Sequence, residues 1–206
     1  MWYLFHGTDE FSAREALEAL RAESDSGYEQ DIFKGMEAAL ADLIGACETF
    51  PFLSDQRLVV LEGLPKKSAS RKAKDASSGS QAAGAASEGQ QSEAQGASRK
   101  KGSKKGRSAS ADAAAFITGL AEFLPNLPET TTLVILADEA LEAGHPLMQA
   151  AKHGGTVRQF TTPTGAALEQ WIEERAKRLG NTITTEACKM LALYAGHDLR
   201  LLASEL

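Results

Sequence analysis

The sequence predicts an α/β fold with a parallel sheet, followed by a small all-helical region. Three observations lead to this prediction. Short apolar segments alternate with segments of helical periodicity up to residue 162, one segment (Thr131–Ala137) is apolar almost throughout, as a strand buried on both faces requires, and only helical periodicity continues after Pro163. Strands that alternate with helices are typical of a parallel sheet covered by helices on both faces. We therefore expect an α/β domain over residues 1–162 and a helical domain over residues 163–206.

The individual elements follow from local patterns. The first strand ends at a Gly7-Thr8-Asp9 turn, where Thr8 or Asp9 can cap the next helix through a side-chain oxygen. Gly180 is a stop signal for the first helix of the second domain. The expected strands are residues 2–6, 28–33, 58–61, 131–137 and 157–160. The expected helices are residues 11–20, 36–48, 113–124, 164–179, 184–194 and 198–206.

A basic insertion interrupts the first domain. Residues 65–111 hold 11 Lys and Arg against 3 Asp and Glu, whereas the rest of the chain holds 11 against 25. The insertion contains no Leu, Ile, Val, Phe, Met, Trp or Tyr, so it cannot bury enough apolar surface to offset the entropy lost on ordering. We expect a disordered, basic, low-complexity loop on the surface of an otherwise acidic domain.

Composition excludes several classes of protein. The two cysteines, Cys47 and Cys188, are far apart and stand in no CxxC or Cys/His cluster, so neither a disulfide framework nor a zinc site is expected. The apolar start of the chain has no basic region before it, and no segment approaches the length of a membrane span. These features favour a protein of the reducing cytoplasm that neither crosses a membrane nor is secreted.

The first strand, turn and helix stand where a nucleotide-binding P-loop would stand. A P-loop requires G-x-x-x-x-G-K-[ST], but Gly7 is followed by TDEFSAR, which lacks the lysine and the Mg²⁺-binding hydroxyl and adds Asp9 and Glu10. Asp138 and Glu139, after the apolar strand, have the order of an acidic pair found in many ATPases. Without the lysine we interpret them as the solvated end of an ordinary strand, and a degenerate P-loop ATPase remains an alternative.

The sequence offers no other catalytic or metal site. The four histidines (His6, His145, His153 and His197) occur singly in different elements, and no GxSxG or HExxH motif is present. We therefore expect no intrinsic active site, no metal and no cofactor.

One loop is richer in large apolar side chains than a turn needs. Residues 49–56 (TFPFLSDQ) join a predicted amphipathic helix to a buried strand, and Phe50, Phe52 and Leu53 lie within them. These side chains could cover the core. They could instead form a plug, with Pro51 restricting the backbone so that Phe52 and Leu53 enter a pocket on a partner.

Five segments carry a resemblance to a known family. They are residues 3–10 (YLFHGTDE), 46–61 (ACETFPFLSDQRLVVL), 128–137 (PETTTLVILA), 168–176 (LEQWIEERA) and 195–206 (AGHDLRLLASEL). In this order and spacing the chain resembles the delta subunit of the bacterial DNA polymerase III clamp loader. The resemblance implies an AAA+-like α/β domain without a functional P-loop and a helical lid domain. It also implies a further C-terminal collar domain, so we expect a chain that ends at Leu206 to be truncated and defective in assembly.

The resemblance also implies a function. Delta subunits bind the ring-shaped sliding clamp (beta) and hold one of its interfaces open, as non-catalytic partners of the gamma/tau and delta-prime subunits in the bacterial cytoplasm. The segment that contacts the clamp falls on Phe50, Pro51, Phe52, Leu53 and Ser54, with Phe52 and Leu53 as the apolar pair. AAA+ relatives place a nucleotide-sensing arginine at Arg200, which we interpret as structural here.

The basic insertion leaves two further hypotheses. Its cations could contact primer–template DNA through salt-sensitive phosphate interactions, or it could be a solvated linker. A nucleic-acid-binding adaptor that acts mainly through this insertion is a second alternative function. The candidate DNA contacts are Lys66, Lys67, Arg99, Lys100, Lys101, Lys104 and Lys105.

Overall fold

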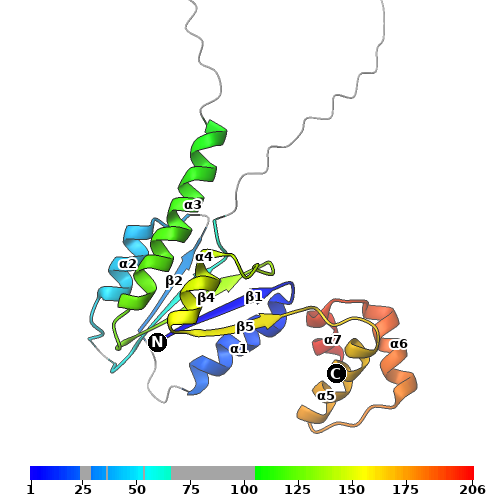
Figure 1. Ribbon diagram of the computed structural model, residues 1–206. Helices are drawn as coiled ribbons and strands as arrows, with labels where there is room; N and C mark the ends of the chain where they lie inside the picture. Colours follow the sequence, from blue (N-terminus) through cyan, green and yellow to red (C-terminus); the bar gives the residue numbers. More distant parts are fainter. Residues whose placement is uncertain (24–28, 36, 53, 66–104) are drawn as a thin grey trace, which may run out of the picture.

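Five parallel strands form a single sheet in the computed structural model, which describes residues 1–23, 29–35, 37–52, 54–65 and 105–206. The strands lie in the order β2-β3-β4-β1-β5 (Figure 1). They are β1 (Trp2–Gly7), β2 (Glu29–Lys34), β3 (Arg57–Glu62), β4 (Thr131–Ala137) and β5 (Thr156–Phe160). All four pairings are parallel, which confirms the predicted fold class.

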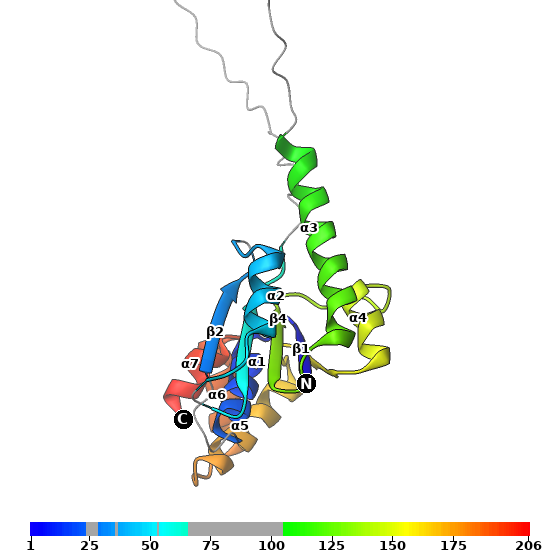
Figure 2. The same cartoon turned by 90° about the vertical axis from the view of Figure 1, so that its left-hand side faces the viewer.

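Helices cover both faces of the sheet because successive strand residues point to opposite sides. Leu133 and Ile135 of β4 pack in one cluster with α2 (Leu40–Glu48), α3 (Lys105–Phe123) and α4 (Pro146–Ala150). Val134 and Leu136 pack in a second cluster with α1 (Glu10–Glu23). Figure 2 shows α2 and α3 side by side, with the first half of α3 extending away from the sheet. Two short 3₁₀ turns, η1 (Leu124–Asn126) and η2 (Ala151–His153), follow α3 and α4.

Three further helices follow β5 and share a hydrophobic cluster of their own. They are α5 (Ala166–Arg178), α6 (Thr185–Ala195) and α7 (Leu199–Glu205), and they lie to one side of the sheet (Figure 1). The side chains buried among these helices are Leu168, Ile172, Cys188, Leu199 and Leu202. Phe11 of α1 also packs against this cluster, and the domain boundary at residue 162 stays a prediction.

The structure differs from the predicted elements most clearly in three helices. Helix α2 begins at Leu40 rather than at residue 36, because Glu37 and Ala38 turn back onto the Lys34 carbonyl. Helix α3 begins at Lys105, so residues 105–111, predicted as the disordered end of the insertion, are helical. Helix α4 was not predicted, since five residues are too few to show a period. Pro65 is among the described residues, and the rest of the insertion, residues 66–104, lies outside them.

Within the described part of the chain, no helix combines the length and the apolar character needed to span a membrane.

Candidate functional site

The apolar loop joins α2 to β3 at the edge of the sheet where the strands begin. Its two described phenylalanines are strongly exposed, Phe50 at 76% and Phe52 at 91%, whereas Pro51 between them is buried. Ser54 is half-buried, and Leu53 lies outside the described residues. Phe50 and Phe52 therefore do not cover the core, which was one of the two interpretations of this loop.

Thr49, the first residue of the loop, caps the C-terminal end of α2. The Thr49 amide donates to the Gly45 carbonyl at 3.0 Å, and the Thr49 hydroxyl donates to the same oxygen at 2.6 Å. At the other end, the Ser54 hydroxyl donates to the Gln56 carbonyl at 2.7 Å. These local bonds satisfy backbone groups that a helix end and a turn leave unpaired.

A buried thiol lies under the start of the loop. Burial raises the pKa of Cys47 to about 12, and the nearby Arg57 lowers it only in part. The Cys47 side chain is therefore a neutral thiol near pH 7 and packs like an apolar group in the same cluster as Leu43.

Exposed phenylalanines can contribute binding free energy to a partner. Transfer of apolar surface from water is worth about 25 cal/mol per Å², and one buried aromatic anchor contributes roughly 2 kcal/mol or more to an interface. The loop holds two such rings between Thr49 and Ser54, whose hydroxyls both donate hydrogen bonds to backbone carbonyls. Helix α6 also exposes apolar side chains (Met190, Leu193 and Tyr194), on another part of the molecule.

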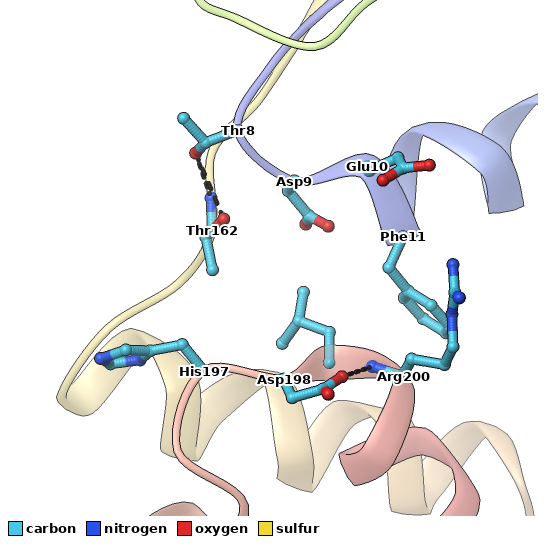
Figure 3. A pocket seen from close by; sticks show the side chains of 9 residues that line it. Thr8, Asp9, Glu10, Phe11, Thr162, His197, Asp198 and Arg200 are labelled. Carbon is cyan, nitrogen blue, oxygen red and sulfur yellow. Dashed lines mark hydrogen bonds between the residues drawn. The ribbon is translucent and has the colours of Figure 1, made fainter. Parts of the chain in front are cut away.

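A pocket lies at the opposite edge of the sheet, where β1 and β5 end and face α7. Its volume is about 290 Å³, and its wall combines Asp9, Glu10 and Asp198 with His197 and Arg200 (Figure 3). Nucleotides commonly bind at this edge of open α/β sheets. The pocket therefore stands where the P-loop comparison places a nucleotide.

The chain's own carboxylates occupy the helix N-termini at this pocket. Asp9 caps α1 by accepting the Ser12 N–H at 2.9 Å, which decides between the two predicted caps. Asp198 caps α7 by accepting the N–H groups of Arg200 and Leu201 at 3.0 Å (Figure 3). Helix N-termini are the groups that bind phosphate in nucleotide sites, so a phosphate would compete here with two carboxylates.

Asp138 and Glu139, the acidic pair of the ATPase alternative, line two different cavities. Asp138 lines a small cavity of about 30 Å³ between the strand ends and α1, beside Glu62, Asp9 and Glu10. Glu139 lines a different cavity. Arg14, which lines the small cavity, forms an ion pair with Glu10 at 2.8 Å. Neither acidic residue lines the pocket of about 290 Å³ where the P-loop comparison places a nucleotide, so this arrangement gives no support to the ATPase alternative.

One arginine joins α1 to α5. Arg175 pairs with Glu15, and its guanidinium carbon lies 5.3 Å from the centre of the Phe11 ring and 5.7 Å from that of Trp171. The two rings meet edge to face at 6.1 Å. Trp171 therefore packs at the junction between the sheet and the helical region, and this cation–π cluster holds α5 against α1.

The four histidines lie in separate parts of the fold. His6 is buried in β1, where its Nδ1 accepts the Leu141 N–H at 3.1 Å and burial lowers its pKa. His145 caps α4 through an Nδ1 that accepts the Leu147 N–H at 3.3 Å. His153 is exposed, and His197 lines the pocket beside α7. No group of three metal-binding side chains is found among the described residues.

The predicted DNA contacts fall almost wholly outside the described residues. The contacts that lie outside the described residues are Lys66, Lys67, Arg99, Lys100, Lys101 and Lys104. The remaining one, Lys105, is the first residue of α3.

Comparisons with known proteins find a similar family in part of the sequence and a similar fold over the whole chain. The family model "DNA polymerase III, delta subunit" matches residues 3–78, which include β1 to β3 and the apolar loop. Over this segment the chain is thus similar to delta subunits of the bacterial clamp loader.

Among solved structures, the chain is similar to the DNA clamp loader delta protein (YqeN) of Bacillus subtilis. The identity is 18% and the TM-score 0.64, over 99% of this chain and 51% of that one. The chain thus spans about half the length of this structure. A search among curated proteins gives no match. The family match and the shared fold confirm the resemblance predicted from the sequence.

Proposed function

We propose that this chain binds the ring-shaped sliding clamp of DNA replication through the apolar loop and holds the ring open. The observation that carries the proposal is the exposure of Phe50 and Phe52, at 76% and 91%, within the segment that matches the delta family. An apolar pocket on the clamp is a suitable partner, because it would remove both rings from water.

Opening the ring requires no chemistry from this chain. A protein that binds the open ring more tightly than the closed ring shifts that equilibrium by the ratio of the two affinities. The pocket at the other edge of the sheet, whose helix N-termini are capped by Asp9 and Asp198, is consistent with a subunit that works without nucleotide. We therefore propose a non-catalytic subunit of the polymerase holoenzyme with no cofactor.

The other proposed partners follow from the family. They are the gamma/tau and delta-prime subunits of the clamp loader and, through the complex, primer–template DNA, in the bacterial cytoplasm where replication takes place. The basic residues 66–104 remain a proposed DNA contact.

The test is the affinity of the chain for the purified sliding clamp of its own organism. We expect Phe52→Ala/Leu53→Ala to weaken binding by about 2–4 kcal/mol, roughly 30- to 1000-fold, because the anchor is removed. Met190→Ala/Tyr194→Ala is the matched control, since it removes two exposed apolar side chains from α6 and leaves the loop intact. Calorimetry measures all three affinities.

The proposal fails if the folded wild-type chain does not bind the clamp. It also fails if the loop variant binds as tightly as wild type. If the α6 variant loses as much affinity as the loop variant, the contact is not specific to the loop.

A further inference from the structure

Three polar side chains are buried in the described part of the chain, and each makes a hydrogen bond with a backbone group. His6 accepts a bond from the loop after β4, and Asp9 caps α1. The third is Thr131, the first residue of β4, which has no exposed surface. Its hydroxyl donates to the carbonyl oxygen of Cys47 at 2.8 Å, across 84 residues of sequence.

The Cys47 carbonyl belongs to the last turn of α2, directly before the apolar loop. The last carbonyls of a helix have no partner within the helix, and one that is buried must find a partner elsewhere. Thr131 supplies that partner from another element of the fold. The hydroxyl therefore fixes the point from which the loop departs.

The other end of the loop is hydrogen-bonded to Thr130, the residue directly before Thr131. The Arg57 amide, at the first residue of β3, donates to the Thr130 carbonyl at 2.9 Å. The Arg57 side chain in turn donates through Nε to Asp31 of β2, also at 2.9 Å. Both ends of the apolar loop are thus attached to two consecutive residues at the start of β4.

Thr131 is itself held in place through its backbone. Its N–H donates to the Pro128 carbonyl at 3.0 Å, and its carbonyl accepts a bond from the Met1 ammonium group at 2.8 Å. Because this backbone is held in place, the Thr131 hydroxyl can hold the Cys47 carbonyl, and with it the end of α2, in a fixed position.

We infer that Thr131 is a positioning residue for the apolar loop, whose hydroxyl orders the end of α2 so that Phe50 and Phe52 are held ready for the partner. The inference rests on the proposed function. An interface loop that is ordered before binding loses less conformational entropy on binding, so the hydroxyl raises affinity without touching the partner. Valine has the same shape and would fill the same space, but it would leave the Cys47 carbonyl without this donor.

The experiment compares three substitutions in two measurements. Thr131→Val removes the hydroxyl and keeps the shape, and Thr131→Ser keeps the hydroxyl. Thr132→Val is the matched control, because Thr132 is the next residue and points to the other face of the sheet. The measurements are affinity for the purified sliding clamp and hydrogen exchange of the amides of residues 48–56 relative to those of β4.

We expect Thr131→Val to weaken clamp binding roughly 3- to 10-fold and to speed exchange in residues 48–56 more than in β4. Thr131→Ser and Thr132→Val should both bind within about twofold of wild type.

Equal binding by Thr131→Val and wild type, with unchanged exchange in residues 48–56, would overturn the inference. So would a Thr131→Ser variant as weak as Thr131→Val, because packing of the methyl group would then be the cause. Uniformly faster exchange over the whole sheet would show a general structural role instead. If wild type binds no clamp, the proposed function fails, and the exchange comparison still decides the role of Thr131 in ordering the loop.

Discussion

The two edges of the sheet differ in what they leave for a partner. At the edge where the strands begin, a short loop bonded at both ends exposes two phenylalanine rings. At the edge where the strands end, charged side chains line two cavities but bind groups of their own chain: Asp9 and Asp198 cap helices, and Arg14 pairs with Glu10. The charged groups where the strands end are therefore used within the chain, whereas the two rings where the strands begin are largely exposed to solvent.

The largest expected effect concerns Gly7, which stands where a P-loop has its first glycine. Its φ is 136°, and a Cβ there would lie 1.8 Å from the carbonyl oxygen of Phe160 in β5. The glycine is thus required for the close packing of β1 against β5. We expect Gly7→Ala to lower the free energy of unfolding by about 4 kcal/mol or more, measured by urea denaturation.

Gly45→Ala is the matched control, because a Cβ at Gly45 in α2 meets nothing within 4 Å. This change should raise stability by up to about 1 kcal/mol, since alanine favours a helix. A Gly7→Ala protein as stable as wild type would show that the turn is not required for packing, and the comparison of the two edges would lose one of its supports.

The next effect concerns the junction between α1 and α5. Arg175→Gln removes the ion pair with Glu15 and the contacts with the Phe11 and Trp171 rings. We expect a loss of about 1–2 kcal/mol, because a cation–π contact shielded from water is worth more than an exposed ion pair. Hydrogen exchange should become faster in α1 and α5 and stay unchanged in α2.

Lys177→Gln, which removes an exposed positive charge from the same helix, should leave exchange in both regions unchanged. Equal effects of the two substitutions would mean that the charge of α5, and not the contact of Arg175, determines how the helical region is held.

The smallest effect is a dependence of stability on pH. Burial lowers the pKa of His6, so the folded protein takes up its proton at a lower pH than the unfolded chain does. Stability is then fully present above about pH 6.5 and falls below it, by at most about 1.4 kcal/mol per pH unit. Urea denaturation between about pH 7.5 and 5.5 measures this slope.

His6→Asn should flatten the slope, because an Asn oxygen can accept the Leu141 N–H without titrating. His153→Asn, at an exposed position, should leave the slope as in wild type. An unchanged slope in His6→Asn would assign the acid sensitivity to other groups.

Features with a local cause could be predicted from the sequence. The apolar run Thr131–Ala137 is β4 with the predicted bounds, and Asp9, one of two candidates, caps α1. The loop with Phe50 and Phe52 stood out because large apolar groups are unusual in a turn. Its role in binding a clamp remains a proposal.

Features that depend on distant parts of the chain could not be predicted. The hydrogen bond from Thr131 to Cys47 joins residues 84 apart in the sequence, and the contact of Arg175 with Glu15 joins residues 160 apart. No local sequence pattern predicts either contact. The early turns of α3 carry Ala and Ser without an apolar period, which resembled the insertion before them. For α4 a signal existed, since Pro146 at the first helical position often begins a helix.

The most direct test of the account is opening of the sliding clamp itself, followed by a fluorophore and quencher placed on the two sides of one ring interface. Wild-type chain should open the ring with no nucleotide present and to the same extent when Mg²⁺ and ATP are added, whereas Phe52→Ala/Leu53→Ala should give no signal. Opening that requires ATP, or that persists in the loop variant, would contradict the assignment of the work to the exposed loop rather than to the pocket.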